Sequence, residues 1–129
     1  MSTVEDILMT KGPDVLVAGP EDTVFEAARV MAQGKVGSVI VKDGDAIVGI
    51  FTEQDLLCRV VAKSKNPADV KLADVMTCPV KTCQLSDAVQ TCVNIFAEER
   101  IRHLAVVDDG VLVGLISIRD VLIPPPVRA

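Results

Sequence analysis

A chain of 129 residues, half of them hydrophobic, can bury a sizeable core and is too apolar to be disordered. A net charge of −5 and an aromatic content of 2%, without Trp or Tyr, exclude the basic and aromatic surfaces that nucleic-acid binding requires. The N-terminus has no basic segment ahead of an apolar stretch, and the longest apolar run, 111–116, is too short to span a bilayer, so we expect a cytoplasmic protein.

The cysteines and the histidine indicate no reactive or metal-binding chemistry. Cys58, Cys78, Cys83 and Cys92 have no C-x-x-C spacing, and in a reducing compartment each is interpreted as a small buried hydrophobic residue. His103 is the only histidine, so no metal site is expected. A Ser-His-Asp or Cys-His catalytic set is equally unsupported, and we predict that the chain is not an enzyme.

The chain repeats itself at an offset of 65 residues, which becomes 68 near the start of each repeat. Such a repeat fixes the architecture before any local prediction is made. The matched segments include Val48-Gly49 with Val113-Gly114, Asp55 with Asp120, and Asp6-Ile7-Leu8 with Asp74-Val75-Met76. We therefore predict a first repeat over 1–62, a linker over 63–70, a second repeat over 71–124 and a C-terminal tail over 125–129.

In the first half, hydrophobic periodicity predicts the order β-α-β-β-α. A short strand over 15–17 precedes a helix that begins at Thr23, with Asp22 as its cap. The apolar stripe of this helix is Val24, Ala27, Ala28 and Met31. Strands are then expected over 38–42 and 46–51, joined by a turn at 43–45, and a helix over 53–62.

The second half repeats these elements. Its helix stripe is Val89, Cys92, Val93 and Phe96, and its paired strands are expected over 103–107 and 111–116. Pro124-Pro125-Pro126 ends the last helix soon after Asp120. The carboxylates in both hairpins are interpreted as turn residues, because the long loop of a calcium-binding hand is missing. The predicted class is α/β (α+β), with two halves packed by pseudo-two-fold symmetry, since each alone has a marginal core.

Each half carries a turn of the form Ser/Thr-x-x-Asp after a strand, at 52–55 and at 117–120. The purely structural interpretation is a capping box, in which the hydroxyl and the acid satisfy amides of the first helical turn. Gly49 and Gly114, inside the preceding strands, often indicate close approach of another group. A helix N-terminus suits an anion or a hydroxyl-rich ligand, and an aspartate there can accept hydrogen bonds from a ribose diol. Cap and nucleoside site both remain open, and the duplication favours the nucleoside.

Two competing motifs are set aside. Residues 34–38 lack the G-x-x-x-x-G-K-[ST] order of a phosphate-binding loop and follow a helix rather than a strand. Hydrolysis by a carboxylate pair would need Asp55 and Asp120 in one site, whereas repeat symmetry separates them.

The segments 48–57 and 113–122, with the lead-ins Asp6-Ile7-Leu8-Met9-Thr10 and Asp74-Val75-Met76-Thr77, resemble tandem CBS domains, named after cystathionine β-synthase. The resemblance covers 4–123 and is closest to stand-alone bacterial-type pairs. It implies a regulatory module that binds an adenine nucleotide or related adenosyl ligand in clefts between the two repeats. AMP, ADP and ATP are candidates ahead of NAD and S-adenosylmethionine, and no cofactor is required. It also implies a homodimer and a separate regulated protein.

The resemblance further implies which residues contact the ligand. Asp55 and Asp120 would hold the ribose hydroxyls, with Thr52 and Ser117 nearby at ribose or phosphate. The remaining contacts would be Val80, Thr82, Arg102 and His103 for the Asp55 cleft, and Val15, Val17, Gly37 and Ser38 for the Asp120 cleft. Thr82 has only Val17 as its counterpart, so the two clefts are expected to differ, and the Asp55 cleft is favoured for occupancy.

Two hypotheses of different class follow. In the first, the chain is a sensor in which a bound nucleotide favours one arrangement of the halves or of the dimer. In the second, it is a dimerisation or scaffold protein with empty clefts, whose aspartates serve only as helix caps. Neither hypothesis includes nucleic acid or a membrane as a partner.

Overall fold

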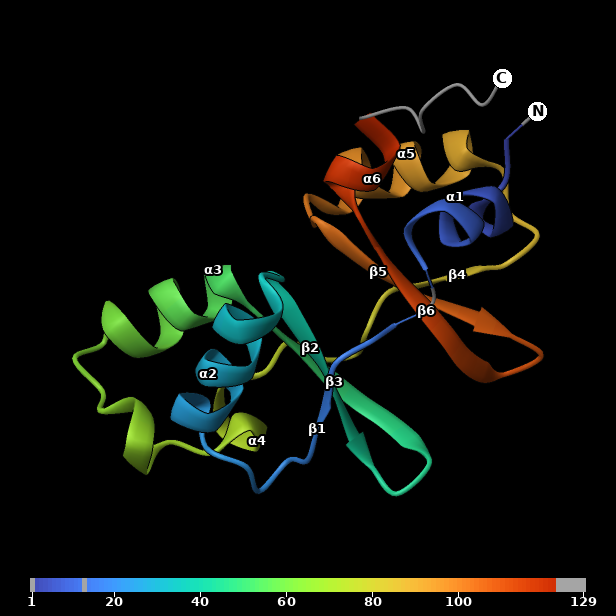
Figure 1. Ribbon diagram of the computed structural model, residues 1–129. Helices are drawn as coiled ribbons and strands as arrows, with labels where there is room; N and C mark the ends of the chain where they lie inside the picture. The colour runs from blue at the N-terminus through green and yellow to red at the C-terminus, as the bar shows by residue number, and fades with distance from the viewer. Residues whose placement is uncertain (1, 13, 123–129) are drawn as a thin grey trace. The chain divides into compact units, whose positions relative to one another are not determined.

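The computed structural model describes residues 2–12 and 14–122, which form two compact units (Figure 1). One unit is Leu16–Val80, and the other joins Met1–Val15 to Lys81–Ala129. We call them the Asp55 unit and the Asp120 unit after the acidic turns that they contain. The units do not coincide with the sequence repeats, because the opening residues of each repeat belong to the compact unit of the other.

The Asp55 unit contains a three-stranded sheet of order β1-β2-β3, with β1 parallel and β3 antiparallel to β2. Its elements are β1 (Val17–Ala18), α2 (Val24–Gly34), β2 (Ser38–Asp43), β3 (Ala46–Thr52), α3 (Glu53–Asp55), the π-helical segment η1 (Leu56–Val61), the 3₁₀ turn η2 (Pro67–Asp69) and α4 (Leu72–Val75). The sheet places the acidic turn directly after β3.

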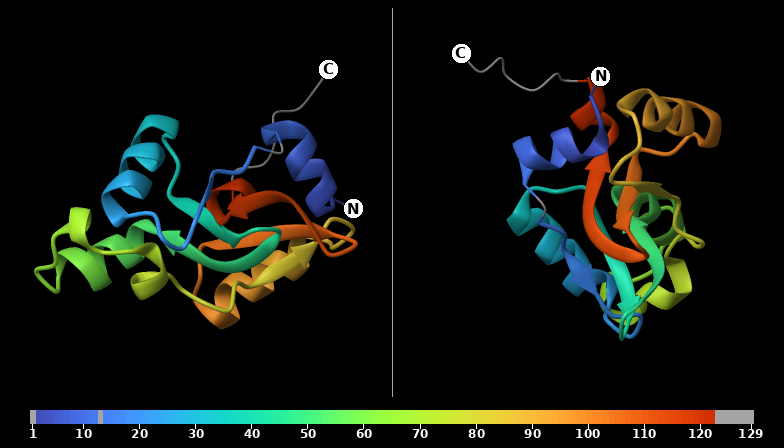
Figure 2. Two further views of the ribbon diagram at one scale, coloured as in Figure 1. Left: turned by 90° about the horizontal axis from the view of Figure 1, so that it is seen from below. Right: turned by 90° about the vertical axis from the view of Figure 1, so that its right-hand side faces the viewer.

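The Asp120 unit repeats this topology as β4-β5-β6. Its elements are α1 (Val4–Lys11), β4 (Thr82–Gln84), α5 (Val89–Glu99), β5 (His103–Asp108), β6 (Val111–Ser117) and α6 (Ile118–Leu122). In all views of Figures 1 and 2, α1 lies beside β6 and α6, although it comes from the other end of the chain. The mixed α+β class with two repeated sheets is confirmed.

The predicted elements are present, with differences at their ends. The strand expected over 15–17 is observed at Val17–Ala18, and the helix expected over 53–62 is α3 continued by the wider η1. The paired strands each extend one residue beyond their predicted C-terminal ends. The proline run at 124–126, expected to end the last helix, lies outside the described residues.

The prediction that Asp22 caps α2 is wrong. Thr23 is the N-cap, because its hydroxyl accepts a hydrogen bond from the backbone N–H of Glu26 at 3.1 Å. Asp22 instead closes the preceding turn by accepting from the N–H of Gly19 at 2.8 Å. Asp87 does the same for Gln84 in the Asp120 unit, also at 2.8 Å. A carboxylate one residue before the cap is therefore used for the turn.

The lead-in helices α1 and α4 supply core side chains to the unit that receives them. Val4, Ile7 and Leu8 of α1 pack with β5, β6 and α5, and Leu72 and Val75 of α4 pack with β2, β3 and α2. All five side chains are buried, so each receiving unit would lose part of its core without its lead-in helix.

Backbone hydrogen bonds join each lead-in to the start of the long helix of its unit. Val4 N–H donates to Asp87 O at 2.9 Å, and Leu72 N–H donates to Asp22 O at 2.9 Å, at the equivalent position. The predicted linker 63–70 takes part as well, because Val24 N–H donates to Val70 O at 2.8 Å and the segment contains η2. Residues 63–70 are thus a folded portion of the Asp55 unit.

The interpretation of all four cysteines as buried is wrong for two of them. Cys83 and Cys92 are buried in the core of the Asp120 unit, whereas Cys58 and Cys78 are exposed. A hydrogen bond with the Cys92 thiol, together with burial, raises the pKa of the Cys83 thiol well above its ordinary value. Only the exposed pair, Cys58 and Cys78, has the solvent access that reactivity requires.

We expect this difference to appear in a thiol titration. In the native protein, 5,5′-dithiobis(2-nitrobenzoic acid) at neutral pH should modify two thiols per chain quickly, and the other two only after unfolding in guanidinium chloride. Cys58→Ser should reduce the fast phase by half. Rapid modification of all four thiols in the native protein would contradict the burial of Cys83 and Cys92.

Candidate functional site

The Asp55 turn follows the end of β3, where Thr52 caps α3. The Asp55 Oδ2 atom accepts from the Thr52 N–H at 3.0 Å and from the Thr52 hydroxyl at 3.2 Å, and the Asp55 N–H donates to the same hydroxyl at 3.2 Å. This is a complete capping box. The interpretation of the turn at 52–55 as a capping box is confirmed.

The second carboxylate oxygen of Asp55 is also engaged. The Thr77 hydroxyl donates to Oδ1 at 2.9 Å, and Arg59 Nε lies 3.6 Å from the same oxygen. Arg59 also donates through Nη1 to the carbonyl of Met76 at 3.1 Å. Asp55 is only 6% exposed, so these partners compensate a carboxylate that is almost completely removed from water.

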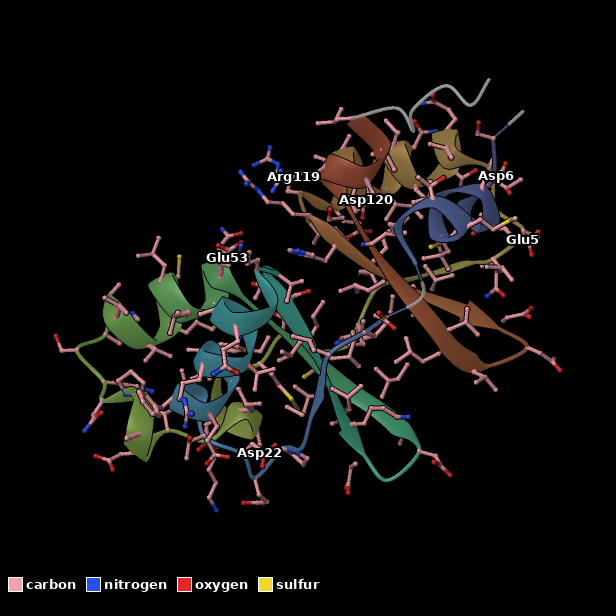
Figure 3. The ribbon with its side chains drawn as sticks, viewed as in Figure 1. Glu5, Asp6, Asp22, Glu53, Arg119 and Asp120 are labelled. Carbon is pink, nitrogen blue, oxygen red and sulfur yellow. The ribbon has the colours of Figure 1, made fainter. Side chains whose placement is uncertain are left out.

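The Asp120 turn has the carboxylate half of this capping box and a different outer partner. Asp120 Oδ2 accepts from the Ser117 N–H at 2.7 Å, from the Ser117 hydroxyl at 3.2 Å and from Lys11 Nζ at 2.8 Å. Its side chain is 20% exposed, and Figure 3 labels it in the first turn of α6. Among the described residues, Oδ1 of Asp120 has no hydrogen-bond donor. Asp120 therefore has one carboxylate oxygen without a donor among the described residues, whereas both oxygens of Asp55 accept hydrogen bonds from the protein.

Lys11 and Thr77 make corresponding contacts with different chemistry. The backbone of Thr77 pairs with that of Ile50, whose carbonyl accepts from the Thr77 N–H at 2.8 Å. In the Asp120 unit the corresponding carbonyl, that of Leu115, accepts from Lys11 Nζ at 2.9 Å. A single ammonium thus binds both the strand carbonyl and the acid, where Thr77 uses a backbone amide and a hydroxyl.

The strand glycines lie under the lead-in helices. A Cβ atom on Gly49 would come within 2.7 Å of Met76 Cγ, and one on Gly114 would come within 2.8 Å of Leu8 Cδ1. The sequence predicted a close approach at these glycines, and that prediction is confirmed. The approaching group is a protein side chain, so neither glycine requires a ligand to explain it.

The remaining predicted site residues are divided between the units. Gly37 and Ser38 adjoin the Asp55 turn, since Gly37 O accepts from the Glu53 N–H at 3.0 Å and Ser38 pairs with Thr52. Arg102 and His103 adjoin the Asp120 turn in the same way, with Ile118 N–H donating to Arg102 O at 2.8 Å and His103 pairing with Ser117. Val17 and Val80 belong to the Asp55 unit, and Val15 and Thr82 belong to the Asp120 unit. The grouping of these residues into clefts stays a prediction from the resemblance.

Three residues of the turns were not predicted from the sequence. Arg59 could have been found, because it stands four residues after Asp55 on the same helical segment, the spacing of an intrahelical ion pair. Thr77 was noted only as part of the lead-in. Lys11 has a proline, Pro79, as its counterpart at offset 68, so the repeat carried no signal for it.

Within 2–12 and 14–122, no helix has the length and apolarity needed to cross a bilayer. Over the same residues, no group of three or more His, Cys, Asp or Glu side chains is arranged to hold a metal ion.

The fold contains two repeated sheets. Each sheet is followed by an acidic turn and is covered by the lead-in helix of the other repeat, so the chain is a module built from two tandem repeats. The family model of the CBS domain matches residues 4–62 and 72–123, which is most of the chain. The chain therefore belongs to the CBS-domain family, and the resemblance inferred from the two turns is confirmed.

The chain is similar to several known proteins. It is 39% identical over 111 residues to an uncharacterized protein of Methanopyrus kandleri, covering 84% of this chain and 57% of that protein. It is 32% identical over 130 residues to the mitochondrial CBS domain-containing protein CBSX3 of Arabidopsis thaliana, covering 94% of this chain and 63% of that protein. The chain thus spans about three fifths of the length of these relatives.

Solved structures show the same fold. A CBS-domain-containing protein from Agrobacterium tumefaciens has 35% sequence identity and a TM-score of 0.89, with 94% of this chain and 97% of that chain covered. A hexameric CBS-CP12 protein from bloom-forming cyanobacteria has 26% identity and a TM-score of 0.85, with 94% of this chain and 70% of that chain covered. CBS-domain proteins are regulatory or signal-transduction modules, and none of the relatives named here is described as an enzyme.

Proposed function

We propose that this chain is a non-enzymatic sensor that binds an adenine nucleotide or a related adenosyl ligand at its acidic turns. The observation that carries the proposal is the Asp120 turn. Ser117 and Lys11 fix the carboxylate through Oδ2, while Oδ1 has no donor among the described residues. A vicinal diol can donate to such an oxygen, which is the use of acidic residues in ribose recognition.

The charged groups around the acidic turns favour a nucleotide over inorganic phosphate. An aspartate repels a phosphate placed directly on it, whereas Lys11 Nζ, 2.8 Å from Asp120, is a cation at the same turn. Arg59 is a cation beside Asp55, with Nε 3.6 Å from Oδ1. A nucleotide with its ribose on the acid and its phosphates toward the cation fits these charges better than inorganic phosphate. AMP, ADP and ATP are therefore proposed ahead of NAD and S-adenosylmethionine.

A thermal-shift series with AMP, ADP, ATP, NAD and S-adenosylmethionine tests the proposal. A ligand at about a hundred times its dissociation constant should add about 2.7 kcal/mol to the free energy of unfolding and raise the melting temperature by several degrees. The shift should be lost when Asp120→Ala is combined with Asp55→Asn. Inorganic phosphate at the same concentration should give no comparable shift. A shift that survives the double variant, or none with any of the five ligands, would refute the proposal.

One observation favours a second candidate, a dimerisation or scaffold protein. Both oxygens of Asp55 are occupied by protein groups, as expected of an acid with a purely structural role. Self-association is proposed under either function, and the cyanobacterial CBS-CP12 relative is hexameric. Sedimentation velocity with and without nucleotide separates the two, because a scaffold should assemble equally in both. We place the protein in the cytoplasm, with a separate, unidentified protein as the regulated partner.

A further inference from the structure

We infer that the two acidic turns bind ligand unequally, because the Thr77 hydroxyl already uses part of the acceptor capacity of Asp55 Oδ1 that a ribose diol would need. This inference rests on the proposed function and concerns the regulation of its site. It assigns the more accessible turn to Asp120, in contrast to the preference for Asp55 expected from the sequence.

The hydrogen bonds of Asp55 leave a ligand one route. Oδ2 already accepts two bonds from Thr52 within the capping box, at 3.0 and 3.2 Å. Both lone pairs of Oδ2 therefore already face donors, which leaves Oδ1 as the less crowded oxygen. Oδ1 accepts from the Thr77 hydroxyl at 2.9 Å and faces Arg59 Nε at 3.6 Å. Oδ1 thus keeps one lone pair beside the Thr77 hydroxyl, and a diol that donates both of its hydroxyls to Oδ1 must replace the Thr77 hydroxyl.

Replacement of the Thr77 hydroxyl does not require the lead-in to leave. The Thr77 backbone stays paired with Ile50 through two hydrogen bonds, of 2.8 and 2.9 Å, which the side-chain rotamer does not affect. The cost of binding is therefore one hydroxyl–carboxylate hydrogen bond and not the unfolding of α4. Thr77 acts as an internal competitor that lowers affinity without closing the site permanently.

The Asp120 turn has no equivalent competitor. Lys11 Nζ binds Oδ2 and the Leu115 carbonyl, and it leaves Oδ1 without a donor among the described residues. The Asp120 side chain is also more exposed than that of Asp55, at 20% against 8%. Binding at Asp120 should saturate first, and binding at Asp55 should follow at higher concentration, so that the module responds over a wider range of ligand concentrations.

Calorimetric titration of the Asp120→Ala protein with ATP tests this competition, because that background reports only the Asp55 turn. Adding Thr77→Val, which keeps the shape and the backbone pairing but removes the hydroxyl, should tighten binding about three- to tenfold. Thr77→Ser should restore the weaker affinity. Thr10→Val is the matched control and should change nothing, because among the described residues the Thr10 hydroxyl bonds only to the Asp6 carbonyl of its own helix.

A second ligand makes the test specific for the diol. With 2′,3′-dideoxy-ATP, which has no ribose hydroxyls, Thr77→Val should leave the affinity unchanged. The competition would be overturned if the Asp120→Ala parent binds ATP measurably and the folded Thr77→Val protein binds it no more tightly. That result would leave the proposed function standing. If no folded variant and no wild-type protein binds ATP or any other adenosyl ligand, the proposed function fails, and the competition with it.

Discussion

Replacing Gly49 with valine is expected to lower the free energy of unfolding of the Asp55 unit by about 3 kcal/mol. The first side-chain carbon alone would come within 2.7 Å of Met76 Cγ, and valine adds two further carbons. Val75, next to Met76, is buried in the core, which limits how far α4 can move away. Urea unfolding followed by circular dichroism measures the loss, since the chain has no Trp or Tyr for fluorescence.

A double-mutant cycle assigns that loss to the contact between strand and lead-in. Met76→Ala in the Gly49→Val protein should recover at least half of the lost stability, because it removes the atoms that the valine meets. Gly37→Ala is the matched control. The nearest atoms to its Cβ would all belong to the side chain of Glu53, which is flexible and exposed, so it should cost less than about 1 kcal/mol. A large loss that Met76→Ala does not relieve would show that the glycine is needed for another reason.

Hydrophobic periodicity was sufficient to predict α2, α5 and the paired strands, whereas the lead-in helices α1 and α4 were not predicted. The stripe of α2 shows why: Val24, Ala27 and Met31 are buried as their spacing predicts, and only Ala28 is partly exposed. The ends of elements depend on single hydrogen bonds instead. The choice of Thr23 over Asp22 as the cap of α2 was decided by which oxygen reaches the Glu26 amide, and both residue types are common caps.

The exchange of lead-in helices between the units could not be predicted in the same way. The apolar residues of α1 and α4 show that each helix buries one face, but not which sheet that face contacts. Gly49 and Gly114 are equivalent, as are Met76 and Leu8, so the repeat pattern fits either pairing equally well. The backbone hydrogen bonds that join Val4 to Asp87 and Leu72 to Asp22 are equivalent as well, so they do not distinguish the two pairings.

The capping role of the acidic turns was predictable because the Ser/Thr-x-x-Asp pattern is local. The burial of Asp55 and its bond to Thr77 are not local, since 22 residues separate the two side chains. Lys11 and Asp120 are 109 residues apart. The sequence could therefore predict that the two turns differ, but it placed the difference at Thr82 and not at the partners of the carboxylates.

Asp55→Ala is expected to cost about 3 kcal/mol, roughly twice the loss from Asp120→Ala. Removing the Asp55 carboxylate eliminates the cap, worth about 1 kcal/mol, and leaves the partly buried Thr77 hydroxyl without its acceptor at a cost of about 1 to 3 kcal/mol. It also removes the anion beside Arg59. At Asp120 the cap is lost as well, but the ammonium of Lys11 keeps the Leu115 carbonyl, and an ion pair of this exposure contributes at most about 1 kcal/mol.

The comparison needs a control for charge and a readout that distinguishes the units. Glu53→Ala removes an exposed acid from the same helical turn and should change stability by less than about 0.5 kcal/mol. Native-state hydrogen exchange reports the stability of each unit separately, so Asp55→Ala should speed exchange in β2 and β3, while Asp120→Ala should act on β5 and β6. Equal losses from the two substitutions would mean that Thr77 and the burial of Asp55 contribute nothing beyond the cap. In that case the two turns would be energetically equivalent, and the unequal ligand binding inferred from their hydrogen bonds would lose its basis.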